Sequence, residues 1–96
     1  MITRQILHEK RGEILRLARR HGADDVRVFG SVARGEAGES SDVDFLVRLE
    51  PGRSLFDLGG LLMDLRDLLA VDVDVVTEGS LYGRFGQAVA RDAVPL

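Results

Sequence analysis

The sequence predicts an α/β fold in which a small β-sheet is packed against helices. Residues 3–21 and 55–69 have the apolar periodicity of helices, and three short apolar segments have the pattern of strands. A chain of 96 residues provides one domain, residues 1–96, with an adequate but small core. We therefore expect one sheet, with helices covering it.

The first expected element is an amphipathic helix from Thr3 to His21. Charged residues fill one face, and the apolar residues fall near the other, namely Leu7, Ile14, Leu17 and Ala18. Gly22 suits the position just after the helix, where glycine readily adopts a left-handed conformation. His8 and His21 have no partner at a metal-ligand spacing, so we expect both to be solvated.

The first expected strand covers Val26 to Phe29. Asp24 and Asp25 precede it and are expected to form the turn that leads into it. A strand of this length separates them from Gly30 by more than about 10 Å. They are therefore not expected to belong to a site near Gly30.

The stretch from Gly30 to Val47 carries the residues that could bind a metal ion and phosphate. Gly30-Ser31 ends the strand and is expected to start a short helix, whose free N–H groups suit phosphate oxygens. Asp42 and Asp44 follow and lead into a strand, 42–47, that places them on one face about 7 Å apart. Carboxylates for a metal ion beside donors for phosphate indicate metal-dependent phosphate chemistry.

Two better-known motifs are excluded in this stretch. Gly30 and Gly35 have the glycine spacing of a P-loop, but Glu36 stands where the phosphate-binding lysine is required. Asp42-x-Asp44 resembles the start of an EF-hand loop, but apolar residues follow where polar ligands and a glycine are needed.

The second expected helix begins after Ser54, which together with Asp57 is close to a capping box, and runs to about Leu69. Its leucines form a stripe wider than one face of a small sheet needs: Leu55, Leu58, Leu61, Leu62, Leu65, Leu68 and Leu69. Either this is a deeply packed crossover helix, or it is shared with a partner protein. Gly59-Gly60 weaken the helix and indicate the close approach of another element.

The last expected strand is Val71 to Val76, which alternates valine with Asp72 and Asp74. An acid pair on a strand is more often a solvated face, but near Asp42 and Asp44 it supplies a third carboxylate. A final helix, 81–94, is expected to close the chain on the sheet.

The composition of the chain excludes several classes of protein and of site. A net charge of −3 argues against a protein that coats nucleic acid, so no direct nucleic-acid partner is expected. No apolar run approaches the roughly 20 residues of a membrane span, and no signal-peptide pattern is present. The absence of cysteine excludes disulfides and thiolate metal sites. The expected location is the cytoplasm, away from the membrane.

This combination of motifs resembles the nucleotidyltransferase superfamily, which shares the palm fold of DNA polymerase β. It is most similar to the minimal prokaryotic branch, the MNT proteins often found with HEPN partners. The signature of that branch is Gly-Ser, ten residues, then Asp-x-Asp, and Gly30-Ser31 with Asp42 and Asp44 match it. The resemblance covers most of the chain. It implies a small mixed sheet of about three to four strands with helices packed on it.

The resemblance also implies roles for individual residues. The catalytic and metal-binding acids are Asp42, Asp44 and Asp74, which would hold two Mg²⁺ ions about 3.5–4 Å apart. Asp72 is the alternative to Asp74. The residues implied to bind the nucleotide are Gly30, Ser31, Arg34 and Ser41. Arg34 either contacts the triphosphate or holds the loop through a carboxylate.

The implied activity is transfer of AMP from ATP to a hydroxyl group, a tyrosine, of a HEPN toxin. The chain would be the antitoxin and would form a hetero-oligomer with that partner. The alternative is a binding module that neutralises the toxin by covering it, for which three acids are unnecessary. Transfer to RNA or to a small molecule such as an aminoglycoside lacks support from a basic patch or a further substrate domain.

Overall fold

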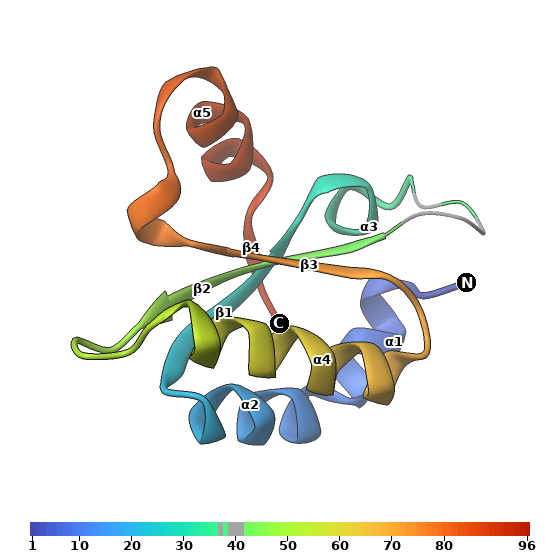
Figure 1. The fold of residues 1–96 in the computed structure, drawn as a ribbon. Coiled ribbons are helices and arrows are strands. Elements are labelled where there is room, and N and C mark those ends of the chain that lie inside the picture. The colour runs from blue at the N-terminus through green and yellow to red at the C-terminus, as the bar shows by residue number, and fades with distance from the viewer. Residues whose placement is uncertain (37, 39–41) are drawn as a thin grey trace.

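The computed structural model describes residues 1–36, 38 and 42–96 (Figure 1). In chain order, its elements are α1 (Arg4–Glu9), α2 (Arg11–Arg20), β1 (Ala23–Phe29), α3 (Gly30–Arg34), β2 (Val43–Leu49), α4 (Leu55–Leu69), β3 (Val73–Thr77), the 3₁₀ helix η1 (Glu78–Ser80), α5 (Gly83–Asp92) and β4 (Val94–Pro95). The helices and strands expected from the sequence are therefore present, with shifted limits, and β4 is an addition.

The four strands form one mixed sheet in the order β3-β2-β1-β4. β1 is antiparallel to both β2 and β4, whereas β2 and β3 are parallel. Parallel neighbours need a crossover connection, and α4 provides it. This arrangement confirms the prediction of a small mixed sheet with helices packed on it.

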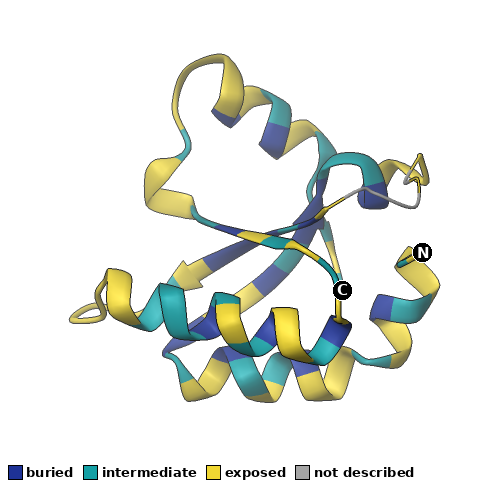
Figure 2. Ribbon diagram, turned by 45° about the vertical axis from the view of Figure 1, so that its right-hand side comes forward, coloured by how far each residue is buried: buried dark blue, intermediate teal, exposed yellow. Residues whose placement is uncertain are grey.

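The helices cover the two faces of the sheet unequally. α1, α2 and α4 lie on one face, and α3 and α5 lie on the other (Figure 1). Successive strand residues alternate between the faces, so Phe45 enters the larger core with Leu61 and Leu65. Leu46 enters a smaller cluster with Phe29 and Val89, beneath α5. Figure 2 shows the buried residues of both layers facing the sheet.

The expected N-terminal helix is divided into α1 and α2 at Lys10, which has φ −95° and ψ 9°. Thr3 caps α1, since its hydroxyl accepts a hydrogen bond of 3.2 Å from the N–H of Ile6. Gly12, just after the break, costs about 1 kcal/mol of helix stability relative to alanine, which weakens a continuous helix here. Gly22 has φ +75°, as expected for the residue after α2.

β1 begins earlier than expected, so Asp24 and Asp25 lie within the strand rather than in a turn. The pairing with β2 shifts between Asp24 and Arg27, and Asp25 has φ +50°. Arg48, the β2 residue opposite Asp24, donates to both carboxylate oxygens of Asp24 at 2.8 and 3.2 Å. An irregularity in the strand and a cross-strand ion pair thus accommodate the two acids, far from Gly30.

α4 has the predicted capping box. The Ser54 N–H donates to Asp57 at 2.9 Å, and the Phe56 N–H donates to the Ser54 hydroxyl at 3.2 Å. Most of the leucine stripe packs in the larger core, so the interpretation as a packed crossover helix holds for those residues. Leu55 is the exception, because it is 82% exposed, and the neighbouring Phe56 is 91% exposed.

The approach of another element to Gly60 is confirmed, and the approaching residue is His21 at the end of α2. The His21 Nε2 lies 2.7 Å from Oδ2 of Asp64, and its side chain is 20% exposed. The prediction that His21 is solvated was therefore wrong. It failed because nothing local to His21 shows that α4, more than forty positions away, brings Asp64 to it.

This contact makes two adjacent glycines behave differently on substitution. A Cβ at Gly59 meets nothing within 4 Å, so Gly59→Ala is expected to raise the free energy of unfolding by about 0.5–1 kcal/mol. A Cβ at Gly60 would lie 2.7 Å from Cε1 of His21, so Gly60→Ala is expected to displace the ring and lose this gain. Urea denaturation of both variants measures the difference. Equal stabilisation would contradict the proposed packing of His21 on Gly60.

None of the helices in residues 1–36, 38 and 42–96 is both long and apolar enough to cross a membrane.

Candidate active site

The Gly30-Ser31 step lies where β1 ends and α3 begins. Gly30 has φ +74°, a left-handed conformation that side chains rarely adopt. A Cβ placed on Gly30 would overlap Oδ2 of Asp44 and lie 3.3 Å from its Cγ. Glycine at this position therefore leaves room for another residue of the site, the carboxylate of Asp44.

The acids are brought together by the register of two strands. Asp44 of β2 is the partner of Asp74 of β3 in the parallel pairing, so the two residues are side by side on neighbouring strands. Strands in a sheet are about 4.8 Å apart. Asp42 lies immediately before the start of β2, two residues from Asp44, and is exposed. Since Phe45 points into the larger core, Asp44 faces the side covered by α3 and α5.

Asp44 is the half-buried member of this group, and its pKa is raised to about 6. The largest cause is the loss of hydration on burial, followed by the negative charges of Asp74 and Asp42. The positive charge of Arg34 opposes the shift. The two neighbouring acids are thus within electrostatic reach of Asp44.

The chemistry of these donors fits a hard divalent cation such as Mg²⁺, which prefers carboxylate oxygen. A bound cation would compensate both the lost hydration of Asp44 and its repulsion by Asp42 and Asp74. Within the described part of the chain, no three His, Asp or Glu side chains are already gathered closely enough to enclose an ion. The observation that supports a metal site is therefore the charge and burial of Asp44.

The geometry distinguishes Asp74 from its alternative, Asp72. The side chain of Asp72 is 76% exposed and lies 3.6 Å from Nη2 of Arg66, a residue of α4 on the opposite face of the sheet. Its backbone carbonyl accepts a hydrogen bond of 3.1 Å from Val43. Asp74, and not Asp72, is therefore the neighbour of Asp44.

Arg34, at the end of α3, contacts two carboxylates. Its Nε lies 2.9 Å from Glu36, and its Nη1 lies 2.5 Å from Asp92 at the end of α5. These contacts agree with the interpretation in which Arg34 holds the local structure through carboxylates. They join α3 to α5 across the same face that carries Asp44.

The two remaining residues that were predicted to bind the nucleotide are Ser31 and Ser41, and only Ser31 lies among the described residues. Ser31 is partly exposed at the start of α3, and its carbonyl accepts a hydrogen bond of 2.8 Å from Glu36. Ser41 lies outside the described residues.

Sequence reasoning missed Asp92, which fixes the position of Arg34. Its side chain is only 20% exposed, and it lies in the last turn of α5. An acid is unfavourable at the negative end of a helix dipole, so its position there was a signal that it has a cationic partner. The identity of that partner depends on how α3 and α5 pack, which the sequence does not show.

Comparison with known proteins gives a consistent result. Residues 11–93 match the sequence family described as nucleotidyltransferase domain. The protein adenylyltransferase MntA of Thermococcus cleftensis is 42% identical over 78 residues, which cover 81% of this chain and 79% of that protein. A solved structure of a candidate minimal nucleotidyltransferase is 49% identical, covers 99% of this chain and 97% of its own, and has a TM-score of 0.86.

A more distant solved structure shows the same fold. It is a toxin–antitoxin complex with AMP-PNP, in which the matching chain is 24% identical with a TM-score of 0.74. The match covers 88% of this chain and 69% of that one.

Proposed function

The chain belongs to the nucleotidyltransferase domain family, and we propose that it is a Mg²⁺-dependent protein adenylyltransferase that modifies a HEPN toxin. The observation that carries this proposal is the register of β2 and β3, which sets Asp44 beside Asp74 and opposite Gly30. Carboxylates and a glycine that leaves room around them are what a site for metal-bound triphosphate requires.

Each residue of the site has a distinct part in the proposed reaction. Asp42, Asp44 and Asp74 would hold two Mg²⁺ ions, which neutralise charge on the triphosphate and make the acceptor hydroxyl a better nucleophile. The free N–H groups of Gly30 and Ser31 would bind phosphate oxygens. Positioning and charge neutralisation supply most of the rate acceleration in reactions of this kind.

The proposed reaction is a displacement at the α-phosphorus of ATP. The acceptor oxygen forms a bond to that phosphorus, and the bond to the bridging oxygen of the β-phosphate breaks, so pyrophosphate leaves. The proton of the hydroxyl passes to a carboxylate of the site or to water. Arg34 is a positioning residue here, because its contacts with Glu36 and Asp92 hold α3 against α5.

The partner is proposed from two relatives. One is a protein adenylyltransferase, and the more distant one is part of a toxin–antitoxin complex with AMP-PNP. We infer that this chain is an antitoxin that forms a hetero-oligomer with its toxin. We propose that the acceptor is a tyrosine hydroxyl of the toxin and that ATP is the donor.

A second candidate function is neutralisation of the toxin by binding alone. Exposed apolar side chains at the start of α4, Leu55 and Phe56, favour a protein partner on that surface whether or not transfer occurs. The two functions differ in their dependence on the acids. A pure binding module would neutralise the toxin with Asp44 replaced, whereas an adenylyltransferase would not.

The test is the intact mass of the HEPN toxin after incubation with this protein, ATP and Mg²⁺. We expect the toxin mass to increase by whole AMP units with wild-type protein, and no increase with Asp42→Asn/Asp44→Asn or with EDTA. Asp72→Asn is the matched control, because it removes a nearby exposed acid that does not adjoin Asp44. It is expected to retain transfer. A stable complex without any adduct would overturn the adenylyltransferase and leave the binding module.

A further inference from the structure

An apolar groove lies along the free edge of the sheet. We call it the edge groove, and its main lining residues are Leu55, Leu58, Val75, Val76, Tyr82 and Phe85. These residues come from α4, β3 and the segment leading into α5. The two most exposed of them, Leu55 and Tyr82, are 82% and 79% exposed. Exposed large apolar side chains gathered around one groove indicate a binding surface.

The floor of the edge groove is β3, an edge strand. β3 is the outermost strand of the sheet and pairs with β2, and no other described strand lies against its outer side. The backbone N–H and carbonyl groups on such an edge are a template for an added strand. An extended peptide bound in this way would gain affinity from backbone hydrogen bonds and specificity from side-chain pockets on the two sides.

The two walls of the edge groove lie on opposite faces of the sheet. Leu55 and Leu58 belong to α4 on one face. Tyr82 immediately precedes α5, and Phe85 lies within α5, on the other face (Figure 1). Alternate side chains of a strand added to β3 would therefore point at alternate walls. This matches a segment with large apolar side chains on both faces.

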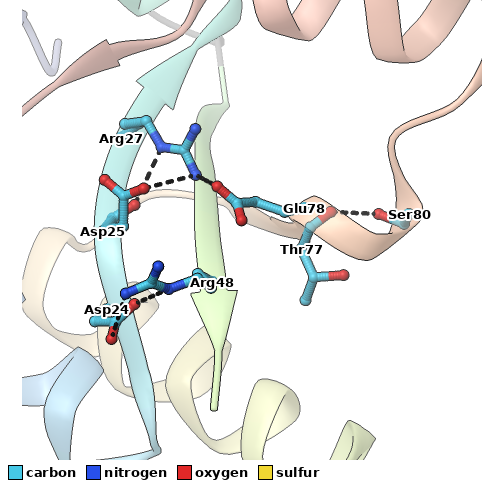
Figure 3. A network of polar contacts seen from close by, with 7 residues as sticks. All are labelled: Asp24, Asp25, Arg27, Arg48, Thr77, Glu78 and Ser80. Atoms are coloured by element: carbon cyan, nitrogen blue, oxygen red, sulfur yellow. Dashed lines mark hydrogen bonds and ion pairs between the residues drawn. The ribbon is translucent and has the colours of Figure 1, made fainter. Parts of the chain in front are cut away.

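Polar contacts hold the wall next to η1 in place, as Figure 3 shows. Arg27 of β1 reaches across the sheet to Glu78 at the start of η1, and its Nη2 also lies 3.4 Å from Asp25. The hydroxyl of Ser80 donates to the carbonyl of Thr77 at 2.8 Å. The turn that leads from β3 to Tyr82 is thus anchored to β1.

We propose that the edge groove binds an extended segment of the acceptor protein, which pairs with β3. This segment places the acceptor hydroxyl beside Asp74. The inference rests on the proposed function, because it names how the acceptor is bound at that site. Thr77, at the groove, is three residues from Asp74 on the same strand, a span of about 10 Å. The bound segment therefore carries its apolar anchors about three residues from the hydroxyl-bearing residue.

The charge of the edge favours a partner over a second copy of this chain. Antiparallel pairing of two β3 strands centred on Val75 would place Asp74 opposite Val76 of the other copy. Covering a charged carboxylate with an apolar side chain is unfavourable. A segment of the acceptor protein can instead place its hydroxyl-bearing residue beside Asp74, so we propose that segment, with its large apolar anchors, as the occupant of the edge groove.

The experiment uses two substitutions that the helices can accommodate. Leu55 is the first residue of α4 and Tyr82 is the N-cap of α5, positions where an aspartate is favourable. Leu55→Asp and Tyr82→Asp are each expected to raise the KM for the HEPN toxin by at least about tenfold. The KM for ATP is expected to stay unchanged, since the groove does not include the metal-binding acids.

Met63→Asp is the matched control, because Met63 is an exposed apolar residue of the same helix that does not line the edge groove. Met63→Asp adds the same charge as the groove variants, and the KM of this variant for the toxin is expected to equal that of the wild-type protein. Hydrogen exchange of the wild-type complex is expected to show new protection of amides in residues 73–77. An unchanged KM in both groove variants, or no new protection of β3, would overturn the inference while leaving the transfer reaction intact.

Two further outcomes separate the alternatives. A protein that is dimeric without toxin and becomes monomeric with Leu55→Asp would show that a second copy occupies the groove, which overturns the proposal. Binding of toxin without any AMP transfer by wild-type protein would overturn the proposed function and the acceptor role with it. In that case, comparing the dissociation constants of Leu55→Asp and wild-type protein for the toxin still decides whether the edge groove binds the toxin.

Discussion

Asp44→Asn is expected to reduce the rate of AMP transfer by about a thousandfold, because it neutralises the half-buried acid that pairs with Asp74 across the sheet and interacts with the charge of Asp42. An amide of the same shape cannot balance the charge of a bound cation. The initial rate of adduct formation on the toxin, at saturating ATP and Mg²⁺, measures this effect. Asp72→Asn, which removes an acid paired with Arg66, is expected to retain nearly full activity.

The same variant is expected to be more stable than wild type when no metal is present. The folded protein holds the pKa of Asp44 at about 6, above the ordinary aspartate value of about 3.9. Folding is therefore opposed by ionisation of this group. The contribution of the protonated Asp44 carboxyl to the free energy of unfolding is complete below about pH 4, and it is lost as the pH rises through about 6.

At pH 7.5 in EDTA, Asp44→Asn is expected to raise the free energy of unfolding by about 1–2 kcal/mol. A rise of about two pKa units corresponds to nearly 3 kcal/mol, and solvent screening of this half-exposed group reduces it. The gain is expected to disappear at about pH 3, which lies below both pKa values, because the wild-type carboxyl is then largely protonated in the folded and the unfolded state. Urea denaturation at the two pH values tests this. Equal stability of the two proteins at pH 7.5 would show that Asp44 is not destabilising.

Gly30→Ala is expected to destabilise the protein by about 2–4 kcal/mol and to reduce transfer at least about a hundredfold. Part of the cost is the left-handed backbone at φ +74°, and part is the overlap of the new Cβ with the Asp44 carboxylate. Displacing that carboxylate by even about 1 Å disrupts the geometry needed for catalysis.

Gly35→Ala provides the matched control for the backbone alone. Gly35 also has φ +74°, but a Cβ there meets nothing within 4 Å, so only a loss of about 1 kcal/mol is expected. Asp44→Ala added to Gly30→Ala is expected to recover the difference, because the overlapping oxygen is removed. Thermal denaturation of these three variants and of Asp44→Ala alone measures this coupling, because the single variant corrects for the effect of removing the Asp44 charge. Equal losses in Gly30→Ala and Gly35→Ala would contradict close packing of Gly30 on Asp44.

The relation of sequence to structure differs between local and distant features. The capping box of α4 depends on Ser54 and Asp57, which are three residues apart, and the structure has it as predicted. The alternation that points Phe45 into the larger core is likewise local. The family resemblance rests on the spacing of Gly30-Ser31 from Asp42 and Asp44, and the family match confirms it.

What the sequence by itself determined is therefore the fold class, most of the elements and the family. Only the tertiary structure decided which residues become neighbours. Asp72 and Asp74 are equivalent by alternation, and the register of β3 on β2 distinguishes them. Arg34 meets Asp92 from 58 positions away, and His21 meets Asp64 from 43. The physical reason is that capping and alternation involve residues within a few positions, whereas these contacts form only when separate elements pack together.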